Sequence, residues 1–173
     1  MGAANEGPWV AEAKPGAKTV DLPLAAHGRV DGVTLSSDGR WIAYVSNESG
    51  FPEVYVRGFQ GPGVSPDAIQ VSRGGADFPV WNGAGGELLF ATADSTLWSF
   101  NTTALGRGEV PEPVRLFRPC ESSGFVFSPT RFTTFMRAYD TRDGKRFLVT
   151  CTVEPLGRFS VLLNWSFSAK RQL

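Results

Sequence analysis

The chain has 173 residues and equal numbers of acidic and basic side chains, 17 of each, with a sequence pI of about 6.6. This balance excludes the basic footprint of a nucleic-acid-binding protein and argues against direct contact with an anionic membrane surface. The hydrophobic content of 42% excludes a disordered tail, and 20 glycines with 12 prolines indicate frequent turns. One histidine and two cysteines argue against Cys/His zinc sites and a disulfide scaffold.

Residues 33–45, VTLSSDGRWIAYV, have the pattern of a tight β-hairpin. A polar Ser-Ser-Asp-Gly turn separates two stretches in which apolar residues alternate. Gly39 suits the turn because a glycine adopts positive φ without a Cβ clash, and Asp38 suits it because aspartate bonds its own backbone.

Residues 1–20 contain neither the basic start nor the apolar run of a secretion signal, and no stretch is long enough to span a membrane.

Two further copies of this hairpin follow. Residues 78–90, FPVWNGAGGELLF, are interpreted as the second copy. Its turn has one extra residue and has Gly85 in place of the aspartate. Residues 138–149, AYDTRDGKRFLV, form the third, in which Asp143 restores the Asp-Gly pair. The turn glycines recur at spacings somewhat longer than the roughly 40 to 50 residues of one propeller blade.

After each turn the pattern continues as strand, loop and strand, so each repeat is predicted to hold three or four short antiparallel strands. Residues 60–67 and 106–113 are rich in glycine and proline and are interpreted as connections within the repeat array rather than as interdomain linkers. One segment is ambiguous. Phe132, Phe135, Met136 and Tyr139 have helical spacing, whereas the pair Thr133-Thr134 favours a strand, and both readings stay open.

The stretch LSSDGRWIAYVSNESGFPEVYVRGF resembles the WD40-like PD40 repeat of TolB-type six-bladed β-propellers. Leu35 and Ser37 depart from the usual Phe and Pro of that repeat, and the second copy keeps Pro79 and Trp81. The positions that match are Ser36, Asp38, Gly39, Trp41, Ala43, Tyr44 and Ser46. The order of repeats through the closing SVLLNW is similar to the C-terminal propeller of bacterial membrane-anchored serine/threonine kinases.

The resemblance implies an all-β fold, a partial β-propeller with antiparallel four-stranded blades, of which about three are present. The implied boundaries are a blade remnant at 1–27 and repeats at 28–75, 76–118 and 119–173. No kinase motif occurs in the chain, so the implied function is non-catalytic: a ligand- or protein-binding sensor module at the C-terminal end of a larger signalling protein. Such a parent would hold the segment outside the cytoplasm, whereas a chain complete as given would be cytoplasmic.

The runner-up function is an accessory propeller that gates an α/β-hydrolase peptidase, because similar repeats precede such domains. In this chain no G-x-S-x-G motif occurs, and the lone His27 is predicted to be an exposed loop residue rather than a catalytic base or metal ligand. No catalytic, cofactor-binding or metal-binding residue is therefore assigned, and no cofactor is expected. The partner is an unidentified protein or small molecule.

Other chemically suggestive residues receive structural interpretations. Asp38 and Asp143 are expected to stabilise turns, since one carboxylate per hairpin cannot supply the ligands of a calcium ion. Cys120 and Cys151 are expected to be free thiols, with a disulfide possible only if their Cα atoms come within about 7 Å. Large aromatic side chains are assigned to packing between blades, namely Trp41, Trp81 and Trp98, while Trp9 is assigned to an outer-strand remnant. The arginine cluster is interpreted as solvated loop charges rather than as an anion-binding site; its members are Arg131, Arg137, Arg142 and Arg146.

A closed six-bladed ring needs about six such repeats, and this chain supplies about half of them. The two end faces of the arc are therefore expected to be uncovered and apolar. We expect the chain to self-associate, to aggregate, or to pair with blades of a parent protein that complete the ring. The edge strand predicted at residues 160–165 is a candidate for pairing with another chain.

Overall fold

Residues 7–61, 63–83, 86–120, 139–151 and 159–162 are described by the computed structural model, the last range as backbone alone. Within these ranges the fold is all-β and antiparallel, with one short 3-10 helix. No helix there has the length and apolar character that a membrane crossing requires. The ambiguous residues Phe132, Phe135 and Met136 and the arginines Arg131 and Arg137 lie outside the described residues.

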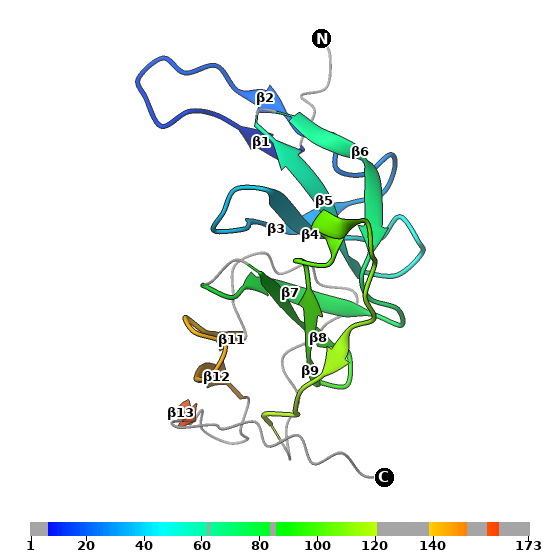
Figure 1. Cartoon of the computed structure of the whole chain (residues 1–173), viewed down its shortest axis with the longest axis vertical. Helices are drawn as coiled ribbons and strands as arrows, with labels where there is room; N and C mark the ends of the chain where they lie inside the picture. Colours follow the sequence, from blue (N-terminus) through cyan, green and yellow to red (C-terminus); the bar gives the residue numbers. More distant parts are fainter. Residues whose placement is uncertain (1–6, 62, 84–85, 121–138, 152–158, 163–173) are drawn as a thin grey trace.

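Four sheets follow one another in chain order along the long axis of the molecule (Figure 1). A two-stranded N-terminal sheet pairs β1 (Trp9–Val10) with β2 (Val20–Asp21). The first four-stranded sheet has the order β3-β4-β5-β6. Its strands are β3 (Val30–Leu35), β4 (Trp41–Ser46), β5 (Glu53–Gln60) and β6 (Gly63–Gln70).

The second four-stranded sheet repeats this order of neighbouring strands, and its last strand is preceded by the helix η1 (Leu105–Arg107). Its strands are β7 (Ala76–Trp81), β8 (Glu87–Thr92), β9 (Leu97–Asn101) and β10 (Val114–Arg115). A third sheet contains three strands among the described residues, β11 (Tyr139–Asp140), β12 (Phe147–Thr150) and β13 (Phe159–Leu162).

One prediction about the connections is wrong. Residues 60–67 are not a loop, because Gly63–Gln70 form β6, the fourth strand of the first sheet. Pro66 fits within this strand because β6 lies at the edge of its sheet, where a residue without a backbone N–H breaks no ladder. Residues 106–113, by contrast, lie almost wholly between η1 and β10.

The central strands of both four-stranded sheets are buried on both faces. On β4, Ala43 and Val45 face the second sheet, and Ile42 and Tyr44 face the N-terminal segment. Because strand side chains alternate between faces, this burial requires a layer of structure on each side of the sheet. The sheets therefore stack in series.

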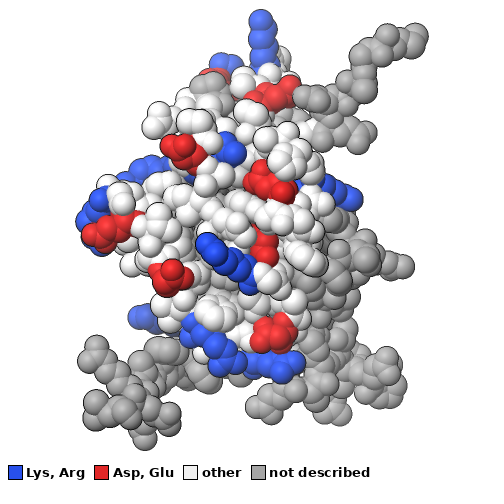
Figure 2. All heavy atoms as spheres, turned by 90° about the vertical axis from the view of Figure 1, so that its right-hand side faces the viewer, with Lys and Arg blue, Asp and Glu red and all other residues white. Residues whose placement is uncertain are grey.

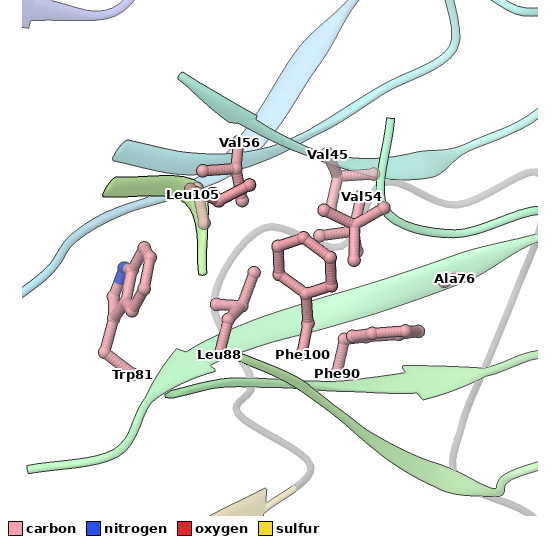
Figure 3. Packing of buried hydrophobic residues seen from close by; sticks show 11 residues of the cluster. Val45, Val54, Val56, Ala76, Trp81, Leu88, Phe90, Phe100 and Leu105 are labelled. Carbon is pink, nitrogen blue, oxygen red and sulfur yellow. The ribbon is translucent and has the colours of Figure 1, made fainter. Parts of the chain in front are cut away.

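The main hydrophobic cluster fills the space between the two four-stranded sheets. Val45, Val54 and Val56 of the first sheet point toward Phe90 and Phe100 of the second (Figure 3). A second cluster lies between the second and third sheets, and consists of Val80, Leu89, Ala91, Leu97, Cys120, Tyr139, Phe147 and Val149. Each interface thus has its own apolar core.

The outer face of the first sheet is covered, which corrects the expectation of two exposed end faces. Leu22 and Leu24, which follow β2, pack against Ile42, Tyr44 and Tyr55, and all five are buried. The opposite end of the stack differs. On β12, Phe147 and Val149 point into the second cluster, whereas Leu148 is 54% exposed.

The first strands of successive sheets lie next to one another. Trp81 on β7 donates a hydrogen bond from Nε1 to the carbonyl oxygen of Thr34 on β3, at 3.2 Å. Tyr139 on β11 donates one from its hydroxyl to the carbonyl oxygen of Phe78 on β7, at 2.8 Å. One side-chain hydrogen bond therefore joins β7 to β3 and another joins β11 to β7, and in each the later strand supplies the donor.

The disulfide is a second correction, because Cys120 and Cys151 are bonded and are not free thiols. Their Cα atoms lie 5.8 Å apart, within the reach of a disulfide. The bond joins the segment after β10 to the residue after β12, which links the second sheet to the third. Spacing along the sequence could not reveal this proximity, since it depends on how the two sheets stack.

Candidate functional site

A cavity of about 460 Å³ lies between the two four-stranded sheets, beside β6 and β9. Residues 70–73, at the end of β6 and just beyond it, form one wall, and residues 110–113, before β10, form another. From β8 and β9 the cavity is bordered by the partly buried Trp98 and by Phe90 and Phe100, which are each only 1% exposed. Its volume falls within the range of small-molecule sites.

The aromatic wall follows from the alternation of β9. Trp98 and Phe100 are two residues apart, so both face the first sheet, and Phe90 of β8 joins them there. The Trp98 indole is held in place because its Nε1 donates to the hydroxyl of Thr92, at 3.0 Å. That hydroxyl donates to Asp94 and, together with the Thr96 hydroxyl, lowers the pKa of the Asp94 carboxyl.

The wall after β6 is fixed by a buried carboxylate. Glu53, at the start of β5, accepts hydrogen bonds from the Ser72 hydroxyl at 2.5 Å and from the backbone N–H of Gly75 at 2.9 Å. The Ser72 hydroxyl also accepts the backbone N–H of Val54. Charge-assisted bonds of this kind hold the loop that carries Arg73.

The polar groups of the cavity lie at its solvent side. Gln70, Arg73 and Glu112 are exposed, and in the part of the chain that the structure describes neither Arg73 nor Glu112 forms an ion pair. On the face of the molecule seen in Figure 2, acidic and basic side chains are interspersed. The cavity can therefore offer an aromatic surface together with separate hydrogen-bond donors and acceptors.

A pair of carboxylates, Asp31 and Asp77, lies on the adjacent first strands β3 and β7. Each precedes a β-bulge, and the next residues, Gly32 and Phe78, have positive φ values of 58° and 57°. Burial raises the pKa of Asp77, and the negative charge of Asp31 adds to that increase. Asp31 is paired with Arg29 at 3.5 Å.

Sequence reasoning missed these two aspartates. The signal that could have found them is the aligned repeat, because Asp31 and Asp77 each lie five residues before the polar residue that begins the hairpin turn, Ser36 or Asn82. Among the described residues, no group of three or more His, Cys, Asp or Glu side chains could hold a metal ion.

The aspartates assigned to turns do act within turns. Asp38 accepts hydrogen bonds from the Ser36 hydroxyl at 2.6 Å and from the backbone N–H of Arg40 at 3.1 Å. These bonds hold its pKa at about 2. Asp143 accepts the backbone N–H groups of Lys145 and Arg146, both at 2.9 Å, and its pKa is also about 2.

The strand registers correct the lengths of these turns. Leu35 pairs with Ile42 and Trp81 with Leu88, so the first and second turns have equal length. The extra residue lies in the third turn, where Asp140 pairs with Leu148. With this alignment Gly85 corresponds to Gly39 and not to Asp38.

The other singled-out residues lie apart from the cavity, except Trp98. His27 is exposed in the connection between β2 and β3, as predicted. Trp81 is buried, and Trp41 and Trp98 are partly buried against the main cluster, which confirms that they pack between sheets. Trp9 is 61% exposed on β1. Arg142 is exposed, and Arg146 is paired with Asp143 at 3.0 Å.

The sequence matches no family model, and no curated protein is significantly similar to it.

Proposed function

We propose that this chain is a segment of a six-bladed, TolB-like β-propeller and serves as a non-catalytic ligand- or protein-binding module of a larger bacterial signalling protein, a serine/threonine kinase. The observation that carries the proposal is the serial stacking of antiparallel four-stranded sheets whose first strands are adjacent. In a propeller the first strand of each blade lies nearest the axis and each blade packs face to face on the next.

The PD40-like pattern also supports the proposal of a propeller segment. The Ser-x-Asp-Gly turn of the first repeat uses Ser36 and Asp38 to close the connection between β3 and β4, with Gly39 at φ 69°. The third repeat has Thr141, Asp143 and Gly144 at the corresponding positions; Asp143 accepts a backbone N–H two residues later, as Asp38 does, and Gly144 has φ 67°. Two turns with shared chemistry at the same place in two sheets favour a repeat array over an unrelated β-sandwich.

A binding role is favoured by the exposed apolar residues. Leu148 projects from the outward face of the third sheet, and Val33 and Leu35 are exposed on β3, the edge strand nearest β7. In a ring these positions would meet a further blade or line the axis. Terminal repeats of an array need such neighbours for much of their stability.

The experiment is to sequence the source DNA on both sides of this segment, and then to express the segment together with its flanking repeats. We expect further repeats and a kinase domain on the N-terminal side, and a compact ring in solution scattering of the longer protein. A hydrolase domain following residue 173 would favour the peptidase-gating role instead. A frame without further repeats would overturn the proposal.

A further inference from the structure

The cavity between the first and second sheets has a wall to which a flat ligand can bind. Trp98 lines it, and the single N–H of its indole is already bonded to Thr92. The indole therefore offers the cavity an apolar surface and no polar group. An aromatic surface of this kind suits a ligand with a ring of C–H groups that can stack on it.

The remaining hydrogen-bonding capacity of the cavity is restricted to a few groups. The hydroxyls of Ser72 and Thr92 are occupied, each donating to a carboxylate and accepting an N–H group. The Gln70 amide donates one of its two N–H groups to the carbonyl oxygen of Ser72, which leaves the second N–H as a donor and Oε1 as an acceptor. Arg73 adds donors and Glu112 adds acceptors.

This combination of groups selects the class of ligand. Arg73 and Glu112 give the cavity one positive and one negative group, so its ionisable lining carries no net charge and favours neither an anion nor a cation. Separate donors and acceptors around an aromatic wall match a molecule that carries several hydroxyl groups, because each hydroxyl both donates and accepts. A neutral sugar has these hydroxyls and also an apolar C–H face.

We propose that this cavity binds a neutral mono- or oligosaccharide, with one sugar ring stacked on Trp98 and its hydroxyls bonded to Gln70, Arg73 and Glu112. The cavity lies wholly within this chain, between β6 and β9. The inference therefore goes beyond the proposed function and needs neither further blades nor a parent protein. The two proposals can fail independently.

The test begins with the whole chain on an array of neutral oligosaccharides of glucose, galactose, mannose, xylose and N-acetylglucosamine. Any sugar that binds is then titrated by isothermal calorimetry. We expect at least one dissociation constant in the millimolar range or below. The Arg73→Gln and Glu112→Gln substitutions are each expected to weaken binding about tenfold, because each removes a hydrogen bond to a charged group.

The chain offers matched control variants. Arg118 is the counterpart of Arg73 in the next repeat, because Leu116 bonds Leu97 as Val71 bonds Val54. It is exposed and does not line the cavity. Arg118→Gln, and Glu109→Gln as the acidic control, are expected to leave the sugar affinity unchanged.

A second measurement does not depend on the folding of any variant at the wall. In ¹H–¹⁵N spectra of the whole chain, the indole N–H signal of Trp98 is expected to shift on addition of the sugar, while that of Trp9 stays in place. Sequential resonance assignment of the wild-type chain identifies the signal. The proposal is overturned if no neutral sugar binds, if the control substitutions weaken binding as much as Arg73→Gln and Glu112→Gln, or if free amino acids or anionic sugars bind and neutral sugars do not.

Discussion

The indole Nε1 of Trp81 bonds the carbonyl oxygen of Thr34 across the interface between two successive sheets. These residues are far apart in sequence, and the bond joins the first strand of one repeat to the first strand of the previous one. At the next interface, Tyr139 bonds the carbonyl oxygen of Phe78. Both interfaces therefore combine an apolar core with a directional bond from an aromatic side chain, and this bond constrains how far one sheet can slide along the other.

The Trp81→Phe substitution tests this bond, because phenylalanine keeps an aromatic ring in the core and removes the donor. We expect a loss of stability of about 1 kcal/mol from the hydrogen bond, and more from the smaller ring. Urea unfolding followed by circular dichroism measures it. Trp9→Phe, at an exposed position, is the matched control and should have little effect. Equal losses in both variants would contradict the assignment.

The bond between Cys120 and Cys151 is expected to form in the purified protein under oxidising conditions. It closes a long loop with a sequence separation of 31 residues, and the chain-entropy relation gives a stabilisation of about 3 to 4 kcal/mol. Reduction should lower the thermal midpoint of the wild-type chain and leave that of the Cys120→Ser/Cys151→Ser variant unchanged. Two titratable thiols in the folded, air-oxidised protein would show that the bond is absent.

Acid should weaken the two Asp-Gly turns. The pKa values of Asp38 and Asp143 are both about 2 in the folded chain, below the ordinary value of 3.8. Both carboxylates therefore stabilise the fold above about pH 4, and that contribution is lost as the pH falls from about 4 to 2.

The Asp38→Asn and Asp143→Asn variants test these turns. Each should be less stable than the wild type at neutral pH, and the difference should shrink at pH 2 to 3, as measured by urea midpoints. Asp67→Asn on β6 is the control, since no hydrogen bond to its carboxylate occurs among the described residues. A difference that does not change with pH would refute the role of the charge.

The contribution of Asp77 to stability should depend on pH in the opposite direction. Burial raises its pKa, so the folded chain favours the protonated carboxyl and ionisation costs stability above the ordinary carboxyl range. Asp77→Asn removes this cost and keeps an oxygen that can accept the backbone N–H of Phe78. We expect a higher urea midpoint at pH 7 and no gain below about pH 4. A loss of stability at pH 7 would contradict the expectation.

The outward face of the third sheet should promote self-association. Sedimentation equilibrium at tens of micromolar protein is expected to show species heavier than the 18.7 kDa monomer. Leu148→Lys places a charge on that face and should shift the distribution toward the monomer. Phe51→Lys, in the connection between β4 and β5, is the control at an exposed apolar position. A wild-type chain that is monomeric at these concentrations would exclude association through this face.

Several features could be predicted from the sequence because they depend on neighbouring residues. The hairpin turns around Asp38 and Asp143 need only a short polar sequence whose side chains bond the adjacent backbone. Strand positions such as Trp41–Ser46 and Glu53–Gln60 follow from residue type and turn spacing in the same way. The assignment of Trp81 to packing follows from its place in an apolar strand.

The features that only the tertiary structure decided all depend on contacts between distant segments. The Cys120–Cys151 bond, the cover that Leu22 and Leu24 place on the first sheet, and the cavity beside Trp98 each arise where two separately folded layers meet. Their geometry is set by how the sheets twist and stack, and one strand's sequence reports only which of its faces is apolar. The same limit explains β6. Its glycines and proline have the composition of a loop, and this edge segment forms a strand only because β5 supplies its hydrogen bonds.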